Sequence, residues 1–87
     1  MRSYKVTITD TASQLIAADN FNRVAYVSIV SNTDIAVGNS SVTFATGLIL
    51  EKHTAPIHID VPLGESLWAI CDTGVTGDIR VLLPDGD

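Results

Sequence analysis

Residues 22–32 read Asn-Arg-Val-Ala-Tyr-Val-Ser-Ile-Val-Ser-Asn, a long apolar-rich run with polar ends. Its β-branched side chains suit a pleated strand, and the asparagines at its borders favour turns. Alternation along a strand places Ala25, Val27 and Ile29 on one face. The other face carries Val24, Tyr26, Ser28 and Val30. Because both faces are largely apolar, the sequence predicts a central strand with one core face and a second face that packs on another sheet or subunit.

Shorter segments of the same type surround this run. Val, Ile and Thr each occur nine times in the 87 residues, which is a strong β bias. Further strands are predicted at residues 4–9, 13–17, 35–37, 48–51, 56–61, 66–71 and 79–83. We expect hairpins at residues 31–34 and 72–78. Residues 42–47 are predicted to form a loop with Phe44 turned inward, rather than a weak strand.

Together these segments predict an all-β fold of seven to eight short strands. Such a pattern is typical of a small antiparallel β-sandwich or barrel, and the jelly roll is its most economical version. Residues 1–87 are expected to form a single domain, in which residues 84–87 are a short acidic tail.

Composition narrows the functional classes. The formal net charge is −5 and the five basic residues are scattered, which argues against nucleic-acid binding. No apolar run approaches the roughly 20 residues of a membrane span, and the first residues lead into a strand pattern rather than a secretory signal. We therefore expect a soluble protein made in a cytoplasm. A domain this small, 46% hydrophobic and with one cysteine, is expected to associate with itself or dock on a partner.

His58, Asp60 and Glu65 are the best candidates for catalytic chemistry. A strand places His58 and Asp60 on one face, and their spacing resembles part of the first metal-binding motif of cupins. In that motif a second histidine stands where this chain has Asp60, and its glycine falls at Asp72. Because a metal site needs three or four ligands, we predict no metal, no cofactor and no enzymatic activity. A minimal cupin-like metalloenzyme is the least favoured alternative, and Cys71 is predicted to be a small buried hydrophobe.

Two strands carry apolar side chains on the face that alternation turns away from the core. Trp68 and Ile70 share such a face, so Trp68 is either an exposed anchor of the kind found at interface hot spots or a core residue. Arg80 and Leu82 share the corresponding face of the last strand, which indicates contact with another chain or cover by the tail. The predicted interface residues are therefore these four and Tyr26 of the central strand.

Arg23 stands at the beginning of the central strand. We expect it to pair with Asp19 or Asp34, a structural role that is favoured over the capture of a ligand.

Several short motifs resemble a group of small virion proteins of tailed bacteriophages. The shared pattern is an Asn-Arg pair before a strand, an Asn turn, a strand ending in Gly, a Gly before a Leu-rich strand, a Leu-aromatic-Ala-Ile strand and an Arg-Val-Leu strand. In this chain the pieces are Asn22-Arg23, Val27-Ser28-Ile29, Asn32, Val37-Gly38-Asn39, Thr46-Gly47-Leu48, Leu67-Trp68-Ala69-Ile70 and Arg80-Val81-Leu82. The resemblance spans about residues 14–83, and residues 52–56 form a longer connection than the pattern has.

The resemblance implies a capsid decoration (cement) protein with a jelly-roll-like sandwich. Such a subunit is made in the host cytoplasm and sits on the outer capsid surface as a homotrimer, where it binds the major capsid protein and stabilises the shell. Neither nucleic acid nor a membrane is an expected partner. The alternative is a head or tail fibre-base module that attaches to a host glycan, in which Trp68 or Tyr26 would contact the sugar.

Overall fold

The structure is a computed structural model that describes residues 1–84. None of these residues is helical, which confirms the predicted all-β class. Residues 85–87, most of the predicted acidic tail, lie outside the described residues. The eight strands are β1 (Arg2–Ile8), β2 (Ser13–Ile16), β3 (Arg23–Ile29), β4 (Ile35–Gly38), β5 (Leu48–Leu50), β6 (Ile57–Val61), β7 (Leu67–Ile70) and β8 (Gly77–Leu83).

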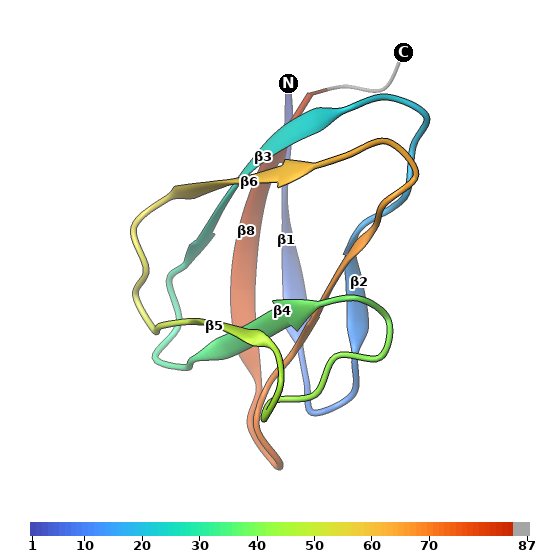
Figure 1. Ribbon diagram of the computed structural model, residues 1–87. Helices are drawn as coiled ribbons and strands as arrows, with labels where there is room; N and C mark the ends of the chain where they lie inside the picture. The colour runs from blue at the N-terminus through green and yellow to red at the C-terminus, as the bar shows by residue number, and fades with distance from the viewer. Residues whose placement is uncertain (85–87) are drawn as a thin grey trace.

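The strands form two antiparallel sheets of four (Figure 1). Sheet A has the order β1-β8-β3-β6, and sheet B has the order β2-β7-β4-β5. The pairing is nested: β1 pairs with β8, β2 with β7, β3 with β6 and β4 with β5. This is the order obtained when one long folded ribbon of four strand pairs is wrapped into a two-sheet sandwich, the jelly roll. The predicted sandwich of jelly-roll type is therefore confirmed.

The two predicted hairpins are wrong. Residues 31–34 join β3 of sheet A to β4 of sheet B, and residues 72–78 lead from β7 of sheet B into β8 of sheet A. The two crossings lie against each other, because the backbone N–H of Asp78 donates to Ser31 Oγ at 3.1 Å. A Cβ at Gly77 would lie 3.1 Å from that oxygen and from Thr33. Both turns thus carry the chain from one sheet to the other. The same polar turn residues also form hairpins, so composition alone does not distinguish the two cases.

The core lies between the sheets. As predicted, Ala25, Val27 and Ile29 face inward and are at most 1% exposed. Val24 and Tyr26 face outward from the same strand and are 43% and 45% exposed. The remaining members of the core cluster are Ile8, Leu15, Ile16, Ile35, Val37, Leu50, Val61, Ala69, Cys71, Ile79, Val81 and Leu83. Inward residues from all eight strands thus fill one layer, as expected for two packed sheets.

A loop covers part of the outer surface of sheet B. Residues 39–47 form no strand, which confirms the predicted loop. Its buried side chain is Val42, whereas Phe44, predicted to turn inward, is only half-buried. Val42 packs where Cβ atoms added to Gly38 and Gly47 would lie, and beneath it Ala36 is fully buried although it points away from the core. The loop therefore acts as a third, local layer over β4.

Candidate interaction surfaces

The five predicted interface residues lie on opposite sides of the sandwich. Tyr26, Arg80 and Leu82 are on the outer face of sheet A, because Tyr26 pairs with Leu82 across the ladder and Arg80 is the next outward residue of β8. Trp68 and Ile70 alternate with the buried Ala69 in β7 and face outward from sheet B. The structure therefore provides two separate faces rather than one patch.

We call the outer face of sheet A the charged face; its middle row runs across all four strands. Ser3, Leu82, Tyr26 and His58 are neighbours in this row. The Tyr26 and His58 rings lie with their centroids 6.2 Å apart. Leu82 is 38% exposed, so the centre of the face is an open apolar area. A shallow hollow of about 170 Å³ lies there, between Tyr26, Leu82 and Pro56.

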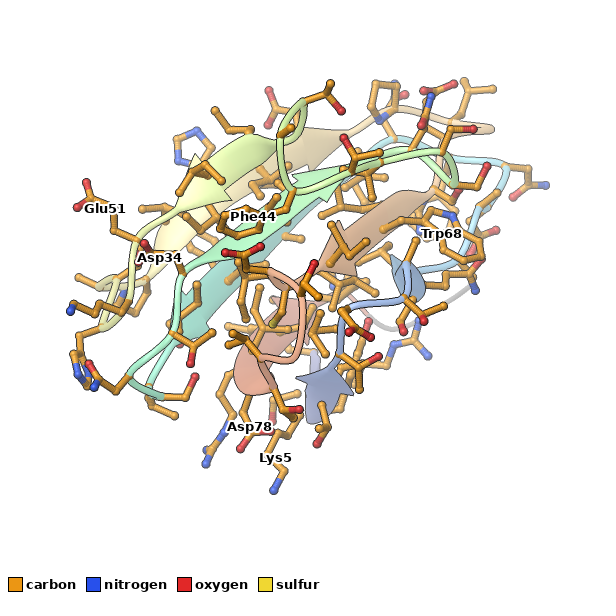
Figure 2. All side chains as sticks on the ribbon, turned by 90° about the horizontal axis from the view of Figure 1, so that it is seen from below. Lys5, Asp34, Phe44, Glu51, Trp68 and Asp78 are labelled. Carbon is orange, nitrogen blue, oxygen red and sulfur yellow. The ribbon has the colours of Figure 1, made fainter. Side chains whose placement is uncertain are left out.

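Four charged side chains flank that middle row. Lys5 of β1 lies directly opposite Arg80 of β8 on one side of it. Asp60 of β6 lies on the other side, opposite Val24. Asp78 is one outward position beyond Arg80, and its Oδ1 accepts a hydrogen bond from Thr7 Oγ1 at 3.0 Å. Figure 2 shows Lys5 and Asp78 together on one side of the molecule, well away from Trp68.

We call the outer face of sheet B the uncharged face. Its strands read SQLI, LWAI, IAVG and LIL, and neither they nor the covering loop of residues 39–47 contains a charged residue. Trp68 is half-buried between Gln14 and Gly38 of the flanking strands, and its Nε1 donates to Ser66 Oγ at 3.1 Å. Ile49, on the edge strand, is 40% exposed. In a chain with 17% charged residues, the four strands and the covering loop thus form an uncharged area, and Asp34, Lys52 and Asp72 lie at its border beside Phe44.

The candidate metal ligands do not converge. His58 and Asp60 share the outward side of β6, as predicted, and both are exposed. Glu65 lies in the connection after β6, where its backbone carbonyl accepts a hydrogen bond from Arg23. Within residues 1–84, no three His, Cys, Asp or Glu side chains are grouped so that they could hold a metal ion. His58 and Asp60 are instead part of the open charged face.

Arg23 occupies a position that the sequence prediction missed. It points into the sandwich and is 5% exposed. Its guanidinium donates to the carbonyl oxygens of Ala17 at 2.7 Å and Glu65 at 3.0 Å, and it lies 5.8 Å from the centre of the Phe21 ring. The expected pairing with Asp19 or Asp34 is wrong. The alternation along β3 could have predicted this position, because Arg23 lies two residues before the inward Ala25 and therefore on the same face.

Comparison with known proteins finds no match to this chain. No protein-family model, curated protein or solved structure matches the chain. In the part of the chain that the structure describes, no helix is long and apolar enough to cross a membrane.

The fold raises the pKa values of two groups, the buried Cys71 thiol and the half-buried Tyr4 phenol. Cys71 is 1% exposed, as predicted, and its thiol donates to the Ile8 carbonyl. Burial raises the pKa of this thiol above its ordinary value. Burial also raises the pKa of the Tyr4 phenol, against a smaller opposite effect of Arg2. The phenol donates to the Leu15 carbonyl at 2.6 Å, so both groups are held in their neutral forms.

Alkaline pH is therefore expected to destabilise the fold. A group whose pKa is raised in the folded state stabilises that state below the unfolded pKa, and this contribution is lost as pH rises through the folded pKa. The urea midpoint should be level from neutral pH to about pH 9 and fall above it, where thiols and phenols ionise. In the double variant Tyr4→Phe with Cys71→Ala the fall should be shallower. An unchanged slope in that variant would contradict the assignment.

Proposed function

We propose that this chain is a structural, non-catalytic subunit that docks on a larger protein assembly through its uncharged face. The observation that carries this proposal is the absence of charge from sheet B and its covering loop, residues 39–47, within residues 1–84. Interface cores are depleted of charged residues and enriched in aromatic ones. A half-buried tryptophan in such a surface is the usual type of binding hot spot.

The assembly that we propose is the shell of a tailed bacteriophage, with the chain as a decoration (cement) subunit on the outer capsid surface. Three features support it: the resemblance of the motifs between residues 14 and 83 to small virion proteins, the small jelly-roll domain, and a face suited to docking. Jelly rolls recur in viral capsid and lectin domains, although a fold alone does not define a function. Each bound subunit would stabilise the assembled shell by mass action, and copies joined as a homo-oligomer would add avidity.

The test is binding to shells of the encoding phage that were purified without this protein. Wild-type chain should co-sediment with the shells at saturating stoichiometry and raise their thermal disruption temperature. Trp68→Ala is expected to weaken binding at least tenfold, because an interface anchor is lost. Gln14→Lys, an exposed neighbour of Trp68 in the register, should do the same by placing an unpaired charge in the contact.

The matched control is Thr73→Lys, which adds the same charge in an exposed turn outside both faces. It should bind shells as the wild type does. A wild-type chain that never co-sediments with shells would contradict the proposal, and so would equal binding by all four proteins. Thermal unfolding of each variant separates loss of binding from loss of fold.

A second candidate, glycan attachment, is favoured by one observation. Tyr26 is 45% exposed and has His58 and Asp60 as polar neighbours on an open surface, an arrangement on which a sugar ring could stack. A glycan-array signal that disappears in Tyr26→Ala but persists in Trp68→Ala would favour this module over the decoration subunit.

A further inference from the structure

We propose that the charged face is a two-fold contact surface between two copies of this chain. The proposal is independent of shell binding, which is assigned to the uncharged face on the other side of the sandwich. The occupant to which the proposal commits is a second copy of the same chain, with the same face presented in return.

Charge balance is the first argument. The chain carries a formal net charge of −5, so most orientations of two approaching copies are repulsive. The charged face avoids this repulsion and also offers complementary charges, because it carries two basic residues, Lys5 and Arg80, and two acidic residues, Asp60 and Asp78. Two copies can thus meet through this face without opposing net charges.

The position of the charges is the second argument. In the order β1-β8-β3-β6, the Lys5–Arg80 pair occupies one corner of the face and Asp60 the diagonally opposite corner. Tyr26 and Leu82 lie between them. Consider a two-fold axis that lies in the contact plane along the other diagonal of the face. It places the basic corner of each copy over Asp60 of the other copy, and it brings the two apolar centres into contact. The strands of the facing sheets then cross nearly at right angles, one of the two common ways in which sheets pack.

The cost of leaving the basic corner unpaired is the third argument. Lys5 and Arg80 are directly opposite each other in an antiparallel pair, where like charges are destabilising. Neither forms an ion pair with a carboxylate of residues 1–84. An Asp60 carboxylate from a second copy would offset this repulsion and become partly desolvated at the rim of an apolar contact, where charge pairs contribute most to specificity.

The test is the mass of the protein in solution, measured by sedimentation equilibrium as a function of concentration and salt. Wild-type chain should be a reversible dimer, or an even-numbered oligomer, whose dissociation constant rises with salt. Asp60→Lys and the double variant Lys5→Glu with Arg80→Glu should each weaken association about tenfold or more, since each places like charges at both corners. Because all three positions are exposed, both variants are expected to fold.

Mixing the two variants gives the decisive measurement. In a mixed pair, the two introduced glutamates of one chain would face the introduced lysine of the other, and the second corner would keep its natural charges. The mixture should therefore form a heterodimer with near wild-type affinity. Gln14→Lys, on the uncharged face, should dimerise normally. A wild-type chain that remains monomeric up to millimolar concentration would overturn the proposal, as would variants that do not restore association on mixing. Neither result would affect the shell-binding test.

Discussion

Replacing Arg23 with leucine is expected to lower the free energy of unfolding by about 3 kcal/mol, because two backbone carbonyl groups lose the same buried, charged donor at once. The guanidinium is the hydrogen-bond donor to Ala17 O and Glu65 O in a site that is 5% exposed. Leucine fills a similar volume but offers no donor. In a small domain whose total stability is about 5–15 kcal/mol, this loss is a large fraction.

The position of Arg23 explains why the effect should be large. It belongs to sheet A, whereas Ala17 follows β2 and Glu65 precedes β7, so both acceptors lie on connections that cross between the sheets. These connections are also joined directly, because the Gly64 N–H donates to the Asp19 carbonyl at 2.7 Å. Arg23 therefore joins the two sheets at one end of the sandwich, where they are not linked by strand pairing.

The measurement is urea unfolding at neutral pH, with two companion variants. Arg23→Lys keeps the charge but has one ammonium in place of a planar fork, so it should lie between wild type and Arg23→Leu. Arg2→Leu removes an exposed arginine and should change stability by no more than about 0.5 kcal/mol. If Arg23→Leu were as stable as Arg2→Leu, the two carbonyl contacts would not contribute as described.

Gly47→Ala is expected to destabilise the protein by about 2 kcal/mol through overpacking. A Cβ at residue 47 would lie 2.7 Å from Val42 Cγ2 and 2.8 Å from Ala36 Cβ, distances that require the covering loop to shift. The neighbour at 3.1 Å is the Val37 backbone carbonyl, which cannot rotate away. Glycine is thus required here for close approach of the loop to β4.

A double-mutant cycle with Val42→Ala tests this explanation. Val42→Ala alone should destabilise, because it empties a buried site, yet it also removes the methyl group nearest to the new Cβ. The two substitutions together should therefore cost less than their sum, by more than about 0.5 kcal/mol in unfolding free energy. Strictly additive effects would show that the clash with Val42 is not the cause.

Alternation along the strands predicts much of the fold. The inward faces of β3 and β8 follow directly from the period of two in their sequences, and the outward faces carry Tyr26, Arg80 and Leu82 as expected. The sequence does not show which strands pair. The partners Ser3 and Leu82 are separated by almost the whole chain, so no local pattern reports their contact. For the same reason, the sequence does not show that Trp68 and Tyr26 lie on opposite sides of the molecule.

Local propensity also fails where a tertiary contact overrides it. The sequence predicts Arg23 beside an aspartate at the surface, because a charge at a strand end is usually solvated. The fold instead buries it, since two crossing connections present carbonyl oxygens to it. Phe44 is the predicted inward residue of its loop, but the space beside Gly38 and Gly47 is filled by the smaller Val42. Both outcomes depend on neighbours that are remote in the sequence.

The nested pairing of the strands has a consequence for how the molecule is made. In sheet A, β8 lies between β1 and β3, yet the ribosome synthesises it after the other seven strands of the described chain (Figure 1). Until β8 emerges, β1 has no partner in its sheet, and the inward side chains Ile79 and Val81 are missing from the core. This sandwich therefore cannot close strand by strand during synthesis, and we expect it to fold at the slow rates of topologies dominated by distant pairings. Chaperones that bind the growing chain would meet seven strands around an unfilled centre.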